Sequence, residues 1–168
     1  MFIDETGINL AMVLAYARAQ RGRRAYAPQP KAQGKNISLI GAMTLKDGLL
    51  NGLSFTGGTT GDLFLWFIET ILCPHLWPGA VVVMDNLPAH KVAGVAEAIT
   101  AAGARLVYLS PYSPEFNPIE HLWSKLKGFL RAVEARTVET LHQAVALGLA
   151  EIGLEDVRNW FAHCCYCD

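Results

Sequence analysis

The chain has 168 residues, of which 52% are hydrophobic and 17% charged, which is enough apolar material for the core of one ordinary domain. It has no uninterrupted apolar run of about 18 residues and does not begin with the basic and apolar segments of a signal peptide. We therefore expect no membrane span or membrane partner, and a cytoplasmic protein with a single domain over residues 1–168. The net charge of −1, taken alone, argues against a nucleic-acid partner.

Apolar periodicity predicts strands and helices in a recognisable order. The sequence Lys46-Asp47-Gly48 is a hairpin turn signal between two of the strands. Strands are expected over residues 1–5, 36–45, 49–56, 80–84 and 105–109, an irregular exposed stretch over 11–35, and helices around Leu63–Leu72 and over about 91–102, 118–132, 138–152 and 154–163. This order predicts an α/β fold, a mixed five-stranded sheet with flanking helices. The ribonuclease H-like fold has the same order of elements.

Charge is distributed unevenly along the chain. Between Thr6 and Lys46 there are seven basic residues and no acidic one. A basic segment close to carboxylates is typical of a protein that binds a phosphate backbone, although a solvated basic loop would look the same. The candidate DNA-binding residues in this segment are Arg18, Arg21, Arg23, Arg24, Lys31 and Lys35.

Asp85 directly follows the apolar strand at residues 80–84. Sites in sheets with parallel strands gather at the carboxyl ends of those strands, which is where Asp85 is expected. Asn86 comes next, and His90 follows shortly before a helix. The alternative is that Asp85-Asn86 only forms a turn that caps this helix.

Thirty-four residues separate Asp85 from Glu120, which lies in a Pro-rich and Asn-rich loop that enters a helix. Its position three residues after Asn117 also fits a capping box, in which the glutamate would serve the helix terminus alone. Along the predicted helix, Glu120 shares a stripe with Lys127 and Arg131, which suits either metal and phosphate binding or an ordinary solvated face.

Asp4 follows the apolar start of the chain and is the third acidic candidate. Glu5 stands beside it, and because side chains alternate along a strand, only one of the two can face a given site. We expect Asp4 to join Asp85 and Glu120 and Glu5 to point away. We also expect Asp85→Asn to leave the fold intact, or to stabilise it by relieving repulsion among the carboxylates.

Three motifs in order give the chain a specific resemblance. They are Phe-Ile-Asp-Glu-Thr, Val-Val-Met-Asp-Asn-Leu-Pro-Ala-His-Lys and Ser-Pro-Tyr-Ser-Pro-Glu-Phe-Asn-Pro-Ile-Glu-His-Leu-Trp-Ser-Lys-Leu-Lys. Together they resemble the catalytic domain of bacterial insertion-sequence transposases of the mariner superfamily, and the resemblance covers nearly the whole chain. It implies a ribonuclease H-like fold on which Asp4, Asp85 and Glu120 bind two Mg²⁺ or Mn²⁺ ions. Asn86, His90 and Asn117 match residues that surround the family's site.

The resemblance also implies a function and partners. We expect metal-dependent DNA cleavage and strand transfer in cut-and-paste transposition, with transposon ends and target DNA as partners and a homodimer as the active form. Relatives carry a helix-turn-helix region before this domain, so an upstream-encoded helix-turn-helix part is a further expected partner. Two alternatives stay open: a stand-alone metal-dependent nuclease or resolvase, and an inactive remnant that binds DNA or protein.

Overall fold

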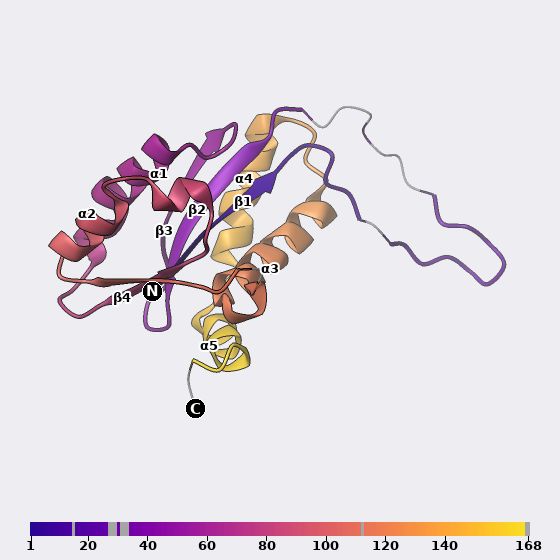
Figure 1. Cartoon of the computed structure of the whole chain (residues 1–168). Coiled ribbons are helices and arrows are strands. Elements are labelled where there is room, and N and C mark those ends of the chain that lie inside the picture. Colours follow the sequence, from indigo (N-terminus) through magenta and orange to yellow (C-terminus); the bar gives the residue numbers. More distant parts are fainter. Residues whose placement is uncertain (15, 27–29, 31–33, 112, 167–168) are drawn as a thin grey trace.

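Five strands form one sheet in the order β3-β2-β1-β4-β5 (Figure 1). The computed structural model describes residues 1–14, 16–26, 30, 34–111 and 113–166. The strands are β1 Phe2–Ile8, β2 Ile37–Thr44, β3 Gly48–Thr56, β4 Val81–Met84 and β5 Arg105–Tyr108, and the α-helices are α1 Gly61–Phe67, α2 Val95–Ala101, α3 Pro118–Val133, α4 Val138–Ala150 and α5 Leu154–His163. Strands β1, β2 and β3 pair antiparallel, whereas β4 and β5 run parallel to β1. The predicted mixed five-stranded sheet is confirmed.

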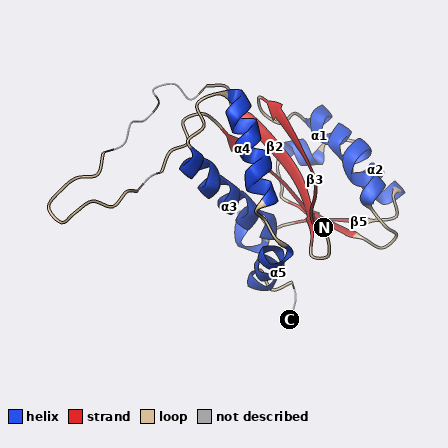
Figure 2. Cartoon of the chain, turned by 180° about the vertical axis from the view of Figure 1, so that it is seen from behind, coloured by secondary structure: helices blue, strands red, loops and turns tan. Residues whose placement is uncertain are grey.

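Alternating side chains of the central strands bury two separate cores. Phe2, Leu39 and Val83 face α3, α4 and α5 on one side of the sheet. Their sequence neighbours Ile3 and Ile40 face α1 and α2 on the other side, with helices covering both faces in Figure 2. Strand β2 is buried at every position because it lies inside the sheet under both layers. None of the helices in the described part of the chain has the length and apolarity needed to cross a bilayer.

Three elements differ from the sequence-based expectation in their bounds. Strand β1 continues to Ile8 because all seven of its residues pair with β2. The helix expected from about residue 91 begins instead as a short 3₁₀-helix over Pro88–Lys91, and α2 starts only at Val95, after Gly94 with its left-handed φ of 99°. The helix that begins at Gly61 widens to a π-helix over Ile68–Leu72.

Gly41 lets α3 approach the sheet closely. It pairs with Asp4 across β1 and β2, and the ring of Trp123 from α3 lies directly above it. A methyl group at residue 41 would lie 2.9 Å from Cη2 of Trp123 and 3.2 Å from Cδ1 of Leu49. The absence of a side chain at Gly41 therefore helps to set the height of α3 over the sheet, and with it the height of Glu120, one turn before Trp123.

We expect Gly41→Ala to lower the free energy of unfolding by about 1–3 kcal/mol, because the added methyl group overpacks the Trp123 contact. Gly128→Ala, inside α3, is the matched control, since nothing lies within 4 Å of a methyl group there. That change should raise the free energy of unfolding by about 0.5–1 kcal/mol. Urea denaturation of the two variants measures both effects, and equal stability of parent and Gly41→Ala would show that α3 does not depend on this contact.

Candidate active site

The sheet brings Asp4 and Asp85 to corresponding positions on two neighbouring strands. Phe2 of β1 is in register with Val83 of the parallel strand β4. Asp4 and Asp85 each lie two residues beyond this pair and therefore on the same face, the one that α3 covers. Residues 81 positions apart in sequence thus become neighbours, because parallel strands end at the same edge.

Asp4 is a buried acid with an unused oxygen. Its side chain is 5% exposed, its Oδ1 accepts the backbone N–H of Glu5 at 2.8 Å, and its Oδ2 has no hydrogen-bond partner in the described residues. Burial, followed by the negative charges of Glu120 and Asp85, raises the pKa of Asp4 from 3.8 to about 8. Asp4 therefore lies within electrostatic reach of both other acidic candidates.

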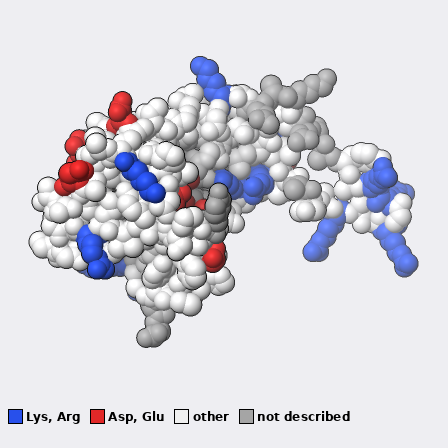
Figure 3. Space-filling view, viewed as in Figure 1, with Lys and Arg blue, Asp and Glu red and all other residues white. Residues whose placement is uncertain are grey.

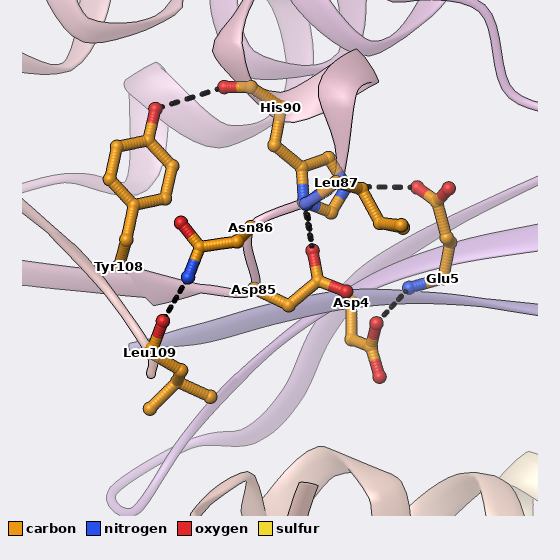
Figure 4. A network of polar contacts seen from close by, with 8 residues as sticks. All are labelled: Asp4, Glu5, Asp85, Asn86, Leu87, His90, Tyr108 and Leu109. Carbon is orange, nitrogen blue, oxygen red and sulfur yellow. Dashed lines mark hydrogen bonds and ion pairs between the residues drawn. The ribbon is translucent and has the colours of Figure 1, made fainter. Parts of the chain in front are cut away.

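Asp85 is held by the loop that follows it (Figure 4). Its Oδ1 accepts the backbone N–H of Leu87 at 3.1 Å and lies 2.5 Å from Nδ1 of His90. The second contact is an ion pair and not a hydrogen bond of standard geometry. Burial would raise the pKa of Asp85, but the contact with His90 and the hydrogen bond from the Leu87 N–H outweigh it and lower that pKa.

The Asp85 side chain is therefore stabilised as an anion, while Asp4 is destabilised as one. We therefore expect the relief of repulsion from replacing Asp4 by Asn and not from replacing Asp85. Asp85 forms an ion pair with His90, and Asp4 has no contact of that kind.

His90 is fully buried between two carboxylates. Its Nε2 lies 3.1 Å from Oε2 of Glu5, and its ring stacks on Phe64 with the ring centres 4.1 Å apart. Burial would lower the pKa of His90, but contacts with Asp85 and Glu5 reverse this and raise it to about 9. Glu5 thus faces the side of β1 opposite to Asp4, as expected, but it points to His90 and not to solvent (Figure 4).

Glu120 does not serve the start of its helix. Asn117 occupies the position before α3, but its side chain makes no capping bond, and no capping box forms there. The Glu120 side chain is exposed and lines the same cavity as Asp85. Asn117 is buried, and its Oδ1 has no partner among the described residues. The capping alternative is therefore not supported, and both side chains are available to a ligand.

An open cavity of about 520 Å³ lies at the carboxyl ends of β4 and β5. Asn86 lines it and donates a hydrogen bond to the carbonyl of Leu109. Lys91 also lines it, with Nζ 5.4 Å from the centre of the Tyr108 ring. Sequence reasoning did not select Lys91, although its place six residues after Asp85 in the same loop was a usable signal. The cavity offers one cation, several polar groups and two carboxylates.

This donor set fits hard divalent cations. Carboxylate and amide oxygens are the ligands that Mg²⁺ and Mn²⁺ prefer. The unpartnered Oδ2 of Asp4 and its raised pKa mark a position where nearby positive charge would be favourable. In the described part of the chain, no three His, Cys, Asp or Glu side chains form a ready-made metal centre. Close convergence of Asp4, Asp85 and Glu120 therefore stays a prediction.

The basic segment lies apart from this cavity. Arg18, Arg21, Arg23, Arg24 and Lys35 are exposed, and Lys31 is outside the described residues. The described residues between β1 and β2 extend well beyond the body of the protein, with blue side chains at the far end in Figure 3. Lys127 and Arg131 are partly buried on α3, and neither lines the cavity. None of the described residues of this segment lines the cavity, and their contact with DNA stays a prediction.

Residues 1–142 match the family described as DDE superfamily endonuclease. The chain belongs to this family. No curated protein matches the sequence at a significant level. The family match covers all three acidic candidates and all five strands of the sheet, so the candidate site lies inside the matched part of this DDE endonuclease.

Solved transposase structures share the fold. A Mos1 transposase paired-end complex with the left transposon end has a TM-score of 0.78 at 14% identity, covering 96% of this chain and 50% of that chain. The Mos1 mariner paired-end complex with Mn has a TM-score of 0.75 at 15% identity, covering 96% of this chain and 51% of that chain. The catalytic domain of Mos1 mariner transposase has a TM-score of 0.65 at 14% identity, covering 96% of this chain and 75% of that chain. At such identities the likeness shows the ribonuclease H-like fold, and the DDE endonuclease spans about half the length of the first two chains.

The buried acid predicts how stability depends on pH. The pKa of Asp4 is raised in the folded protein, so its contribution to stability is complete below about pH 4 and is lost as the pH rises through about 8. Asp4→Asn cannot ionise, and without divalent cations it should exceed the parent in unfolding free energy by about 1–3 kcal/mol at pH 8, with little difference at pH 4. Denaturation at several pH values measures this difference.

The control for this experiment is Asp62→Asn, which changes an exposed aspartate at the start of α1. The unfolding free energy of Asp62→Asn should change with pH in the same way as that of the parent. If Asp4→Asn also runs parallel to the parent, Asp4 ionises as easily as a surface acid, and the electrostatic description of the site is wrong.

Proposed function

We propose that this DDE endonuclease cleaves phosphodiester bonds in DNA and joins the resulting 3′-hydroxyl end to a second DNA, as the catalytic part of a cut-and-paste transposase. The observation that carries the proposal is a pair of acids on the wall of one open cavity, with a third, buried acid within electrostatic reach of both. Asp85 and Glu120 line its wall, and the unpartnered oxygen of Asp4 is buried within electrostatic reach of both. An open cavity with two carboxylates on its wall suits cations and the phosphates that accompany them.

Asp4, Asp85 and Glu120 would hold two Mg²⁺ or Mn²⁺ ions. When bound, such ions stabilise the charge on the attacking and leaving oxygens of a phosphate and help to deprotonate the attacking hydroxyl or water. Supporting the assignment, Mos1 structures with Mn and with Mg share the fold of this chain.

The other groups around the cavity would bind and orient DNA. Lys91 would contact a phosphate oxygen as a point charge, because its ammonium group is the one cation among the lining residues of the described chain. Asn86 keeps the β5 loop in place through its bond to Leu109, and Asn117 presents an unused amide oxygen. Negative charge at the centre and a cation at the wall would favour a phosphate only when divalent ions accompany it.

Partners follow from the same proposal. We assign transposon ends and target DNA as substrates, a homodimer as the active form, and an insertion sequence as the genetic context. The outward course of the described residues between β1 and β2 supports a contact with DNA, or with a second protomer, beyond the chain's own cavity. Recognition of a specific end sequence would come from a helix-turn-helix part.

Catalysis is tested with supercoiled plasmid and with oligonucleotides that carry a free 3′-hydroxyl end. We expect nicking and joining with Mg²⁺ or Mn²⁺ and none with a chelator, and Asp85→Asn and Glu120→Gln should each reduce the rate by a factor of about 10³ or more. Glu115→Gln, an exposed residue of the loop before α3, is the control. Cleavage that survives Asp85→Asn in the presence of a chelator contradicts the mechanism, and cleavage without joining indicates the stand-alone nuclease.

The basic segment is tested through the salt dependence of DNA binding. Phosphate contacts release counterions, and each contact contributes about 0.9 to the slope of log K against log salt. Changing Arg21, Arg23 and Arg24 together to Ala should therefore lower the slope by up to about 2.7 and weaken binding to all sequences alike.

A second triple variant, with Lys46, Arg105 and Arg136 changed to Ala, removes the same charge from other exposed positions. It should keep most of the parental slope. Equal slopes for the parent and the first triple variant would mean that the segment is only a solvated loop.

A further inference from the structure

Glu5 contacts the site through a histidine. It follows Asp4 directly but projects from the opposite face of β1, toward the 3₁₀-helix Pro88–Lys91 (Figure 4). There its Oε2 lies 3.1 Å from Nε2 of His90, and Nδ1 of the same ring lies 2.5 Å from Oδ1 of Asp85. His90 therefore joins two acids that come from different strands and from different faces of the sheet.

The histidine in the middle of this chain of contacts is fixed on all sides. Its ring has no exposed surface and stacks on Phe64. Its backbone N–H donates to the carbonyl of Leu87 at 3.0 Å, and its own carbonyl accepts the hydroxyl of Tyr108 at 3.1 Å. Because the His90 ring has no room to rotate, a change in the position of Glu5 would change the contact that the ring makes with Asp85.

The contact decides which oxygen of Asp85 is available. Oδ1 is occupied by the Leu87 N–H and by His90, whereas no contact of Oδ2 is found among the described residues. In Figure 4 this second oxygen points to the side where Asp4 lies. The two oxygens of Asp4 differ in the same way: Oδ1 accepts a backbone N–H, and Oδ2 has no hydrogen-bond partner in the described residues. Each aspartate thus keeps one oxygen for a ligand.

We propose that Glu5 is a positioning residue for Asp85: it holds the His90 ring at Nε2 so that Nδ1 fixes Oδ1 of Asp85 and leaves Oδ2 toward Asp4. The inference deepens the proposed function, since the task of the free oxygen is to bind a divalent cation there. Glu5 is not itself a ligand in this arrangement, because it lies on the other face of β1 and does not line the cavity.

Two conservative variants of Glu5 separate the effect of its side-chain length from the effect of its charge. Glu5→Gln keeps the length of the side chain and an oxygen that can accept from Nε2, but loses the charge. Glu5→Asp keeps the charge but is one methylene too short for a 3.1 Å contact. If Glu5 acts by position, Glu5→Gln should bind Mn²⁺ within about threefold of the parent, and Glu5→Asp should bind it about 10–100-fold more weakly, the range typical of residues that orient metal ligands.

The affinity is measured at neutral pH by the electron paramagnetic resonance signal of free Mn²⁺ in titrations of the intact chain, with circular dichroism confirming the fold of each variant. The reverse order, with Glu5→Asp near the parent and Glu5→Gln weak, overturns the proposal, as does parental affinity in both variants. Loss as complete as in Asp85→Asn in both variants would make Glu5 a ligand and would also overturn it.

A readout without metal keeps this result separate from the proposed function. Crystal structures of metal-free Glu5→Gln and Glu5→Asp should show the Asp85 rotamer retained in the first and changed in the second, and an unchanged rotamer in Glu5→Asp overturns the positioning role. If Mn²⁺ affinity is instead unaffected by Asp85→Asn and Glu120→Gln, the metal site of the proposed function fails, whatever the rotamer in the Glu5 variants.

Discussion

The site depends on a carboxyl group that the fold buries beside two others of the same charge. Asp4 lies in the middle of the central strand β1, under α3, with one oxygen bonded to backbone and the other without a partner in the described residues. Burial and like charge together make its ionised form unfavourable, as its raised pKa records. A fold selected for stability alone would place an apolar residue there, so the cost is understandable where a cation compensates it.

Packed contacts on both faces of the sheet hold Asp4 in this unfavourable position. On one face, Trp123 packs on Gly41, the cross-strand partner of Asp4, and so sets the approach of the helix that carries Glu120. On the other, His90 is enclosed by Phe64 and by the acids that it joins. The sheet between these two layers supplies the register that brings Asp4 and Asp85 together.

The two aspartates meet opposite electrostatic conditions although they are neighbours. Contacts with His90 and with a backbone N–H at one oxygen lower the pKa of Asp85. For Asp4, burial and two like charges outweigh the backbone N–H of Glu5 and the charge of His90. The same surroundings therefore raise the pKa of Asp4 and lower the pKa of Asp85. Divalent ions would remove much of the difference, because positive charge between the acids favours the ionised form of both.

Local sequence determined most of the elements and marked the acidic candidates. The apolar run of β4 ending at Asp85, the hairpin signal at Gly48 and the periodicity of α3 depend on neighbours in the chain, so their patterns are readable without the fold. What only the tertiary structure decided is how side chains from distant segments meet. The partnership of Glu5 with His90 crosses 85 positions, and the close contact of Gly41 with Trp123 crosses 82. Sequence periodicity places a side chain on a face of its own element but cannot say what packs against that face, and the protonation of Asp4 depends on that packing.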